Sequence, residues 1–309
     1  MVTKKTAGLS IFAGPNPWKE LLATARDFGK IVDKPQDAHA IMWFGRDPQQ
    51  IVGRWSSKLQ WLQLPDAGIE KWLLPEVLDG NFVTTSAAGA YGSQVAEHAL
   101  ALILAGRHEL VRAARATYWD PDNLNVRTLD AVSVLIIGAG GIGSRLGFLL
   151  GNVGCTVEYA TRHARLVSPD TFSIAVENLY PRLADFDVVV LACPSTSDTR
   201  GLVNHSFLRQ MKSEASLINV ARGDLVVTKD LTCALENHDI RFAALDVTDP
   251  EPLPPDHRLF TLENCLITPH VANPPRAKRA SFVRLVHDNM ELFVEGKKMH
   301  GLISGNVGY

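Results

Sequence analysis

Three polar residues in the last third of the chain, Arg222, Glu251 and His270, each follow an apolar run at short range. An arginine can hold a carboxylate through two parallel N–H bonds. A histidine can donate a proton to a newly formed alkoxide, and a carboxylate beside it favours the imidazolium form and fixes the ring. Each residue alone is as readily a surface ion-pair partner or a core residue. Together they have the chemistry to hold a small acid and protonate an oxygen on it.

A glycine-rich segment further upstream predicts a phosphate-binding turn. Gly138, Gly140 and Gly143 have the GxGxxG spacing between an apolar run and a helical pattern. In such a turn the first glycine permits the bend, the second lets the backbone approach a pyrophosphate, and the third allows close packing of the helix. The first N–H groups of the helix, those of Gly141 and Ile142 among them, would face the phosphates. Glycine-rich turns are common, but the strand before, the helix after and the next strand all favour a dinucleotide site.

Short apolar runs alternate with helical stretches along the whole chain, and this alternation predicts an α/β protein. Helices are expected at 17–29, 95–108 and 277–296. Strands are expected at 8–14, 40–44, 59–64 and 82–86, and then at 131–138, 156–160, 187–193, 215–221, 241–247 and 265–270. The later runs are almost wholly apolar, as in parallel sheets covered on both faces.

We therefore expect a doubly wound, parallel cofactor domain of the Rossmann type inserted in a smaller α/β domain. The cofactor domain is predicted at 101–274, and the smaller domain at 1–100 plus 275–309, with the 95–108 helix bridging the two.

The segment "TVEYATRHAR", residues 156–165, departs from the usual pattern. About 20 residues after the first glycine, an acidic residue usually accepts hydrogen bonds from the adenosine ribose. This chain has Thr161 and Arg162 there, with Arg165 close behind. The loss of a carboxylate and the gain of positive charge favour a 2'-phosphate, so NADP(H) is expected to be preferred, with NAD(H) possible. The alternative is that both arginines are ordinary surface charges and that NAD binds without its acidic anchor.

Composition excludes several classes of protein. The 309 residues carry 31 basic and 33 acidic side chains, a net charge of -2, which gives no global attraction to nucleic acid or to an anionic membrane. The four cysteines are far apart and form no metal-binding pattern, which favours reduced thiols in the cytoplasm. No apolar run is long enough for a membrane span, and no metal site is expected.

The chain resembles the D-isomer-specific 2-hydroxyacid dehydrogenases over nearly its whole length. The matching stretches occur in the order of the family: "LQLPDAGIEKW", "VAEHALALIL", "IIGAGGIGSRLG", "LACPSTSDTRGLVN", "INVARGDLV", "ALDVTDPEPLP" and "TPHVA". The resemblance implies a flavodoxin-like substrate domain, built from both ends of the chain, around a Rossmann domain. It also implies a homodimer joined largely through the cofactor domains.

The resemblance assigns roles to individual residues. It implies that Arg222 orients the substrate, that His270 is the acid/base and that Glu251 supports it. Further residues implied to bind ligands are Gly68 and Ile69 for the substrate carboxylate, and Pro194, Thr199 and Asp246 for the dinucleotide.

Departures from the family pattern also matter. Glu251 speaks against formate oxidation, for which members carry glutamine. The absence of a C-terminal regulatory domain disfavours the serine-regulated phosphoglycerate dehydrogenases.

The resulting expectation is an NADPH-preferring reductase of small 2-oxoacids, of the glyoxylate and hydroxypyruvate kind. One alternative is a non-enzymatic NAD(P)-sensing interaction protein of the co-repressor type. Another is a dehydrogenase of the same fold for a different substrate, such as a phosphorylated hydroxy acid or phosphite. His98, on the predicted 95–108 helix, is expected to be a packing or hinge residue outside the site.

Overall fold

The computed structural model describes residues 8–45, 47–119, 121–168 and 171–303. The chain forms two compact units, unit 1 from Met1–Tyr91 and Pro275–Tyr309, and unit 2 from Gly92–Pro274. The ends of the predicted smaller domain, 1–7 and 304–309, lie outside the described residues. Among the described helices, none has the length and apolar character needed to cross a membrane.

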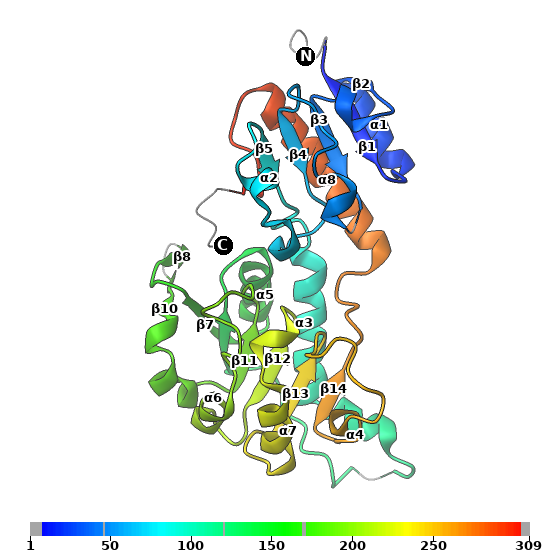
Figure 1. Cartoon of the computed structure of the whole chain (residues 1–309). Coiled ribbons are helices and arrows are strands. Elements are labelled where there is room, and N and C mark those ends of the chain that lie inside the picture. The colour runs from blue at the N-terminus through cyan, green and yellow to red at the C-terminus, as the bar shows by residue number, and fades with distance from the viewer. Residues whose placement is uncertain (1–7, 46, 120, 169–170, 304–309) are drawn as a thin grey trace. The chain divides into compact units, whose positions relative to one another are not determined.

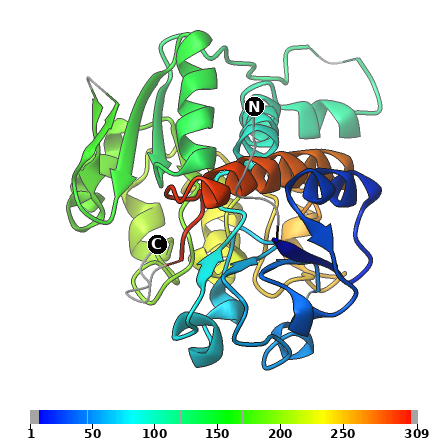
Figure 2. The same cartoon turned by 90° about the horizontal axis from the view of Figure 1, so that it is seen from above.

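Unit 1 is built on a five-stranded parallel sheet in the order β2-β1-β3-β4-β5, which is the flavodoxin-like order. The strands are β1 (Ser10–Gly14), β2 (Lys30–Ile31), β3 (Ala40–Trp43), β4 (Trp61–Gln63) and β5 (Val83–Thr85). The helices are α1 (Lys19–Phe28), α2 (Pro75–Leu78) and α8 (Pro275–Val294). Helix α8 runs alongside α1 (Figure 2), so the C-terminal part of the chain completes the unit that the N-terminal part begins.

A buried polar cluster ties the C-terminal segment to the sheet of unit 1. Asn289 of α8 is fully buried, and its amide donates to Gln63 Oε1 at 3.0 Å and to the carbonyl of His300 at 3.1 Å. Its Oδ1 accepts from the His300 N–H at 2.7 Å. The same Gln63 Oε1 accepts from Thr85 Oγ1 at 2.8 Å. A buried polar group without a partner is costly, so this cluster specifies how the chain end docks.

Replacing Asn289 by alanine is expected to lower the apparent free energy of unfolding by about 3 kcal/mol, because polar groups of Gln63 and His300 lose a buried partner. Chemical denaturation measures the change. Asp288→Ala, at the next and half-exposed position of the same helix, is the matched control and should have little effect. Equal losses in the two variants would contradict the role given to the cluster.

Unit 2 contains a seven-stranded parallel sheet in the order β10-β7-β6-β11-β12-β13-β14. The strands are β6 (Ser133–Ile137), β7 (Thr156–Thr161), β10 (Ile174–Ala175), β11 (Val188–Leu191), β12 (Ser216–Asn219), β13 (Phe242–Leu245) and β14 (Cys265–Ile267). A small antiparallel pair, β8 (Leu166–Ser168) and β9 (Thr171–Phe172), stands beside it. The strand order reverses between β6 and β11, where doubly wound sheets bind ligands at the carboxyl ends of the strands.

Helices cover both faces of this sheet (Figure 1). Helices α3 (Gly92–Arg107) and α5 (Gly141–Asn152) pack on one face, and α6 (His205–Gln210) and α7 (Thr228–Glu236) on the other. Short α4 (Leu110–Arg115) follows α3. Neighbouring residues of one strand, such as Leu135 and Ile136, are both fully buried although they point to opposite faces. The predicted α/β fold with a doubly wound parallel sheet is confirmed.

The compact units differ from the predicted domains, 1–100 plus 275–309 and 101–274, at one of the two divisions. The first division lies at 91/92, so helix α3 belongs to unit 2. The reason is packing, because Val95, Ala96 and Ala99 are buried as fully as Leu102 and Ile103 further along the same helix. The whole helix lies against α5, β12 and β13. The second division lies at 274/275.

Candidate active site

The glycine-rich turn lies at the point where the strand order of unit 2 reverses. Strand β6 ends just before Gly138, which has a φ of 110°, and α5 begins at Gly141. A Cβ on Gly143 would lie 1.9 Å from the Gly138 carbonyl oxygen, so only glycine lets α5 approach the strand this closely. A Cβ on Gly140 would meet no heavy atom within 4 Å. The turn therefore has open space beside Gly140. The first N–H groups of α5, including those of Gly141 and Ile142, also belong to this turn. This fits a pyrophosphate.

The end of β7 is organised by a buried serine. Ser173 Oγ lies 2.5 Å from Thr161 Oγ1, accepts from the Arg165 N–H at 3.0 Å, and donates to the Arg165 carbonyl at 3.1 Å. The Thr161 hydroxyl also reaches the carbonyl of His163 at 2.8 Å. The segment thus curls as a loop, and Arg165 Nη2 donates to the carbonyl of Ala139, inside the glycine-rich turn, at 3.3 Å.

Arg162 of the same loop reaches the segment that follows β11. Its Nη2 lies 3.3 Å from Asp198 Oδ2. In that segment the Thr199 hydroxyl donates to the carbonyl of Pro194 at 2.8 Å and accepts from the Thr196 N–H at 2.8 Å. The predicted residues of the β7 and β11 ends are therefore neighbours. Both side chains of this ion pair are exposed. Exposed pairs are weak, so another anion can replace Asp198 as the partner of Arg162.

Arg222 follows β12 on a turn fixed by a buried asparagine. Asn219 is fully buried, its Nδ2 donates to the carbonyl of Arg222 at 2.8 Å, and its Oδ1 accepts from the Ala221 N–H at 3.0 Å. Arg222 Nη1 donates to the Ala221 carbonyl at 2.8 Å. A Cβ on Gly223 would lie 2.0 Å from the Thr248 carbonyl, so the turn packs directly on the segment after β13. The position of Arg222 is set by its backbone.

Glu251 and His270 form a direct pair. His270 Nδ1 lies 2.7 Å from Glu251 Oε1, with both side chains about half exposed, at 54% and 45%. An exposed pair of this kind contributes little to stability, about 1 kcal/mol at most. Its geometry leaves Nε2 as the ring nitrogen that does not face Glu251. The arrangement has the form of an oriented acid/base whose second nitrogen is available to another molecule.

Asp246 binds the segment that carries His270 and is 3% exposed. Its Oδ1 accepts from Thr268 Oγ1 at 2.6 Å and from the Val271 N–H at 2.9 Å, and its Oδ2 accepts from the Ala272 N–H at 3.1 Å. Burial acts to raise the pKa of Asp246, but hydrogen bonds from His98, Thr268 and the two amides outweigh it and hold the pKa at about 2. The carboxylate is therefore ionised and bound to the segment that carries His270.

Gly68 and Ile69 lie in unit 1, in the loop after β4. The loop is held at Asp66, whose carboxylate pairs with Lys71 at 2.9 Å and with Lys278 at 3.4 Å. Burial acts to raise the pKa of Asp66, but the two lysines lower it overall. Ile69 is buried and precedes the short turn Glu70–Trp72. The other predicted site residues all lie in unit 2.

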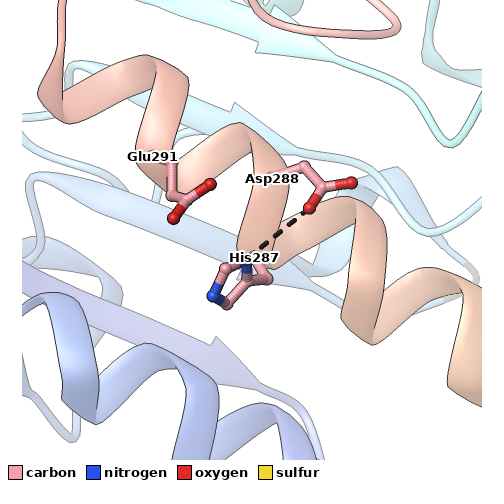
Figure 3. A group of neighbouring side chains, drawn as sticks. All are labelled: His287, Asp288 and Glu291. Carbon is pink, nitrogen blue, oxygen red and sulfur yellow. Dashed lines mark ion pairs between the residues drawn. The ribbon is translucent and has the colours of Figure 1, made fainter.

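A group of side chains on α8 has the atom types of a metal site. His287, Asp288 and Glu291 come from one partly exposed stretch of the helix (Figure 3), and their ligand atoms lie within 4.8 Å of one another. His287 Nδ1 is 3.5 Å from Asp288 Oδ1, and its ring packs edge-on against Phe28. These contacts explain the cluster as ordinary helix surface, and we assign it no site.

Sequence reasoning missed Asn219, Thr268 and Ser173, which position the predicted residues. Asn219 was detectable as a polar residue inside a strand-like apolar run. Thr268 directly precedes Pro269 and His270, but its bond to Asp246 joins two different strand ends. Nothing in the sequence near Ser173 points to the loop that it organises.

The fold and these strand-end residues define an α/β protein of the dinucleotide-binding class. A family profile described as "D-isomer specific 2-hydroxyacid dehydrogenase, NAD binding domain" matches residues 97–272. The chain therefore belongs to the D-isomer specific 2-hydroxyacid dehydrogenase family, an oxidoreductase family that uses a nicotinamide cofactor.

Two curated proteins are similar to this chain over most of its length. An "Uncharacterized protein in proB 3'region" of Corynebacterium melassecola is 35% identical over 300 residues, which is 96% of this chain and 98% of the relative. The glyoxylate reductase/hydroxypyruvate reductase of Homo sapiens is 31% identical over 271 residues, 85% of this chain and 83% of the relative.

A solved structure agrees in fold. It is a D-isomer specific 2-hydroxyacid dehydrogenase from Xanthobacter autotrophicus Py2 in complex with NADPH and MES. The TM-score is 0.82 at 24% identity, and the alignment covers 98% of this chain and 99% of the solved one.

Proposed function

We propose that the protein reduces a small 2-oxoacid to the D-2-hydroxyacid, in the manner of a glyoxylate/hydroxypyruvate reductase, with NADPH preferred over NADH. The observation that carries the proposal is the direct His270–Glu251 pair at 2.7 Å, on the same sheet as Arg222 and the glycine-rich turn. Curated glyoxylate and hydroxypyruvate reductases about 30% identical over most of the chain support the substrate class.

In this proposal the residues divide the work of carbonyl reduction. Arg222 holds the substrate carboxylate and polarises the adjacent carbonyl through paired N–H bonds. His270 donates its Nε2 proton to the oxygen that becomes the hydroxyl, and Glu251 keeps the ring oriented through Nδ1. The nicotinamide, when bound, supplies the hydride.

The proposed cofactor site combines the glycine-rich turn with the ends of β7 and β11. Gly138, Gly140, Gly141, Ile142 and Gly143 would hold the pyrophosphate. Pro194 and Thr199 would line the dinucleotide. Asp246 would accept from the nicotinamide carboxamide through Oδ2, which has one protein donor in the contacts described above.

Preference for NADPH rests on the charges at the end of β7. Thr161 stands where an acidic ribose anchor is usual, and Arg162 and Arg165 bring two cations into the same loop. Because the Thr161 hydroxyl is already bonded to Ser173 and His163, we give the arginines the larger share in holding a 2'-phosphate. NADH is proposed as a second, less preferred cofactor, because the pyrophosphate site in the glycine-rich turn is the same for both.

Arg162→Ala is expected to raise the Michaelis constant for NADPH by roughly tenfold and to leave that for NADH nearly unchanged, since the 2'-phosphate is the part of the cofactor that the guanidinium would contact. Steady-state kinetics with each cofactor, together with direct binding by fluorescence titration, measure the difference. Arg209→Ala, at an exposed arginine on α6, is the matched control. The same change for both cofactors would count against the proposed specificity.

A spectrophotometric screen tests the activity itself. Each of NADH and NADPH is combined with glyoxylate, hydroxypyruvate, pyruvate and bulkier 2-oxoacids. The expected result is that NADPH is oxidised fastest with glyoxylate and hydroxypyruvate. Binding of NADPH without turnover of any 2-oxoacid would overturn the proposal and favour a cofactor-sensing interaction protein.

We propose further that the protein is a homodimer, with a second copy covering the segment around α4. Four large apolar side chains in residues 110–126 are exposed, Leu110, Tyr118, Trp119 and Val126, and Trp119 is 94% exposed. An open cavity of about 660 Å³ lies beside α4, lined by residues that include Arg112, Asn125 and Arg241. Apolar surface gathered in this way is typical of an interface.

The dimer should appear in sedimentation as twice the mass of one chain. Trp119→Glu is expected to shift it toward the monomer by placing a charge in the buried contact. Phe172→Glu is the matched control, because Phe172 is also an exposed aromatic, 72% exposed, on the separate β8–β9 pair. A monomeric wild type would refute the assembly without touching the proposed reaction.

The proposed compartment is the cytoplasm. Cys155, Cys193, Cys233 and Cys265 are all free thiols. Free thiols, one of them exposed, fit a reducing environment.

A further inference from the structure

The turn that carries His270 is held by hydrogen bonds to one buried carboxylate, that of Asp246. Asp246, just after β13, binds Thr268, Val271 and Ala272 through its side chain, and its backbone carbonyl accepts from the His270 N–H at 2.8 Å. These bonds lie on both sides of His270 in the sequence. The position of the imidazole is therefore set by how firmly Asp246 is held.

His270 itself has a φ of 53°, in the left-handed region that residues other than glycine avoid. Such a conformation persists only where surrounding contacts impose it. If the bonds to Asp246 loosen, the backbone of His270 can relax to an ordinary conformation. The ring would then leave the position in which Nδ1 meets Glu251.

A histidine of helix α3 contacts both Thr268 and Asp246. His98 Nε2 lies 3.0 Å from Thr268 Oγ1 and 3.4 Å from Asp246 Oδ1. The one hydroxyl proton of Thr268 is given to Asp246, so the Thr268 oxygen accepts and His98 Nε2 must carry the hydrogen. The network thereby fixes the protonated nitrogen of His98.

A second residue of α3 holds the far end of the same turn. Gln94 Nε2 donates to Asn273 Oδ1 at 3.0 Å. Residues 94 and 98 are four apart and so share one face of the helix. Two neighbouring side chains of α3 thus contact the turn at Thr268 and at Asn273, one on each side of His270.

We propose that His98 is a positioning residue for His270: from helix α3, with Gln94, it holds the Asp246–Thr268 pair and so fixes the 268–273 turn. This inference rests on the proposed function, in which His270 is the proton donor. His98 does not touch the reacting atoms and acts only through Thr268 and Asp246. The sequence-based view of His98 as a packing or hinge residue outside the site is refined to this role.

The test compares His98→Leu with His98→Gln in the full-length protein. Leucine removes the donor, whereas the glutamine amide can reach Thr268 with an N–H and does not titrate. We expect His98→Leu to lower kcat by roughly tenfold, the scale for a buried acceptor that loses its hydrogen-bond donor. His98→Gln should recover most of the loss, and the dissociation constant for NADPH should change little in either variant. His205→Leu, at an exposed histidine that starts α6, is the matched control.

A second readout does not depend on turnover. Amide hydrogen exchange of Val271 and Ala272 in the cofactor-free protein should be faster in His98→Leu and close to wild type in His98→Gln. Thr268→Val and Thr268→Ser repeat the comparison at the other end of the bond, should His98→Leu fail to fold. A loss of kcat and faster amide exchange in Thr268→Val, both restored in Thr268→Ser, would support the network.

Unchanged exchange and unchanged kcat in both His98→Leu and Thr268→Val would overturn the proposal. Failure of the proposed function looks different, because wild type would then lack turnover or His270→Ala would retain it. In that case the exchange measurement still decides whether His98 holds the turn.

Discussion

Replacing His270 by alanine is expected to lower kcat for 2-oxoacid reduction by about 10²- to 10⁴-fold, the range that a positioned acid/base contributes. The alanine removes the proton donor, and water must then protonate the new alkoxide. The glycine-rich turn and the end of β7 are untouched, so NADPH should bind as in wild type. Steady-state kinetics and fluorescence titration separate the two effects.

Glu251→Gln is the graded comparison for this prediction. The amide oxygen can still accept from His270 Nδ1, where Glu251 Oε1 now lies 2.7 Å away, but it carries no charge to stabilise an imidazolium. Its loss in kcat should therefore be smaller than that of His270→Ala. Substantial turnover by His270→Ala would mean that another group supplies the proton. A parallel loss of NADPH binding would mean that the substitution had disturbed the fold.

The fold of unit 2 could be predicted because strands buried on both faces are apolar at every position. Val188–Leu191 and Phe242–Leu245 were recognisable as runs with no alternation, bounded by turns. The two-residue strands Lys30–Ile31 and Ile174–Ala175 at the sheet edges are too short to show a period. Their pairing depends on the neighbouring strand rather than on their own residues.

The start of unit 2 could not be located, for a related reason. Helix α3 is apolar on much of its surface, so its pattern predicts a buried helix without indicating which sheet it covers. Contacts with α5, β12 and β13 assign it to unit 2 from Gly92 onward. Those contacts join segments far apart in the sequence, and no local pattern contains them.

The candidate site divides in the same way. Arg222, Glu251 and His270 could be selected as candidates because side chains that follow parallel strands lie at one edge of the sheet. The residues that hold them act across strands. Asn219 fixes the turn of Arg222, and His98 meets Thr268 across 170 residues of sequence. Sequence spacing can therefore indicate candidate reactive groups, whereas the hydrogen bonds that position them are visible only in the tertiary structure.

Arg222→Gln is expected to lower kcat/KM for the 2-oxoacid by roughly 10²- to 10⁴-fold, because two hydrogen bonds from a charged donor to the substrate are lost together. The turn itself should survive the change. Asn219 holds it through the carbonyl of Arg222 and the N–H of Ala221, neither of which involves the substituted side chain. The Michaelis constant should rise and kcat should fall, since the same group both binds the carboxylate and orients the carbonyl.

Arg222→Lys discriminates between charge and geometry at this position. A lysine keeps the positive charge but cannot present two parallel N–H groups, so it should restore substrate binding more than kcat. A lysine variant as active as wild type would show that Arg222 acts as a simple point charge. If instead either variant weakened NADPH binding and left the Michaelis constant of the 2-oxoacid unchanged, Arg222 would belong to the cofactor site.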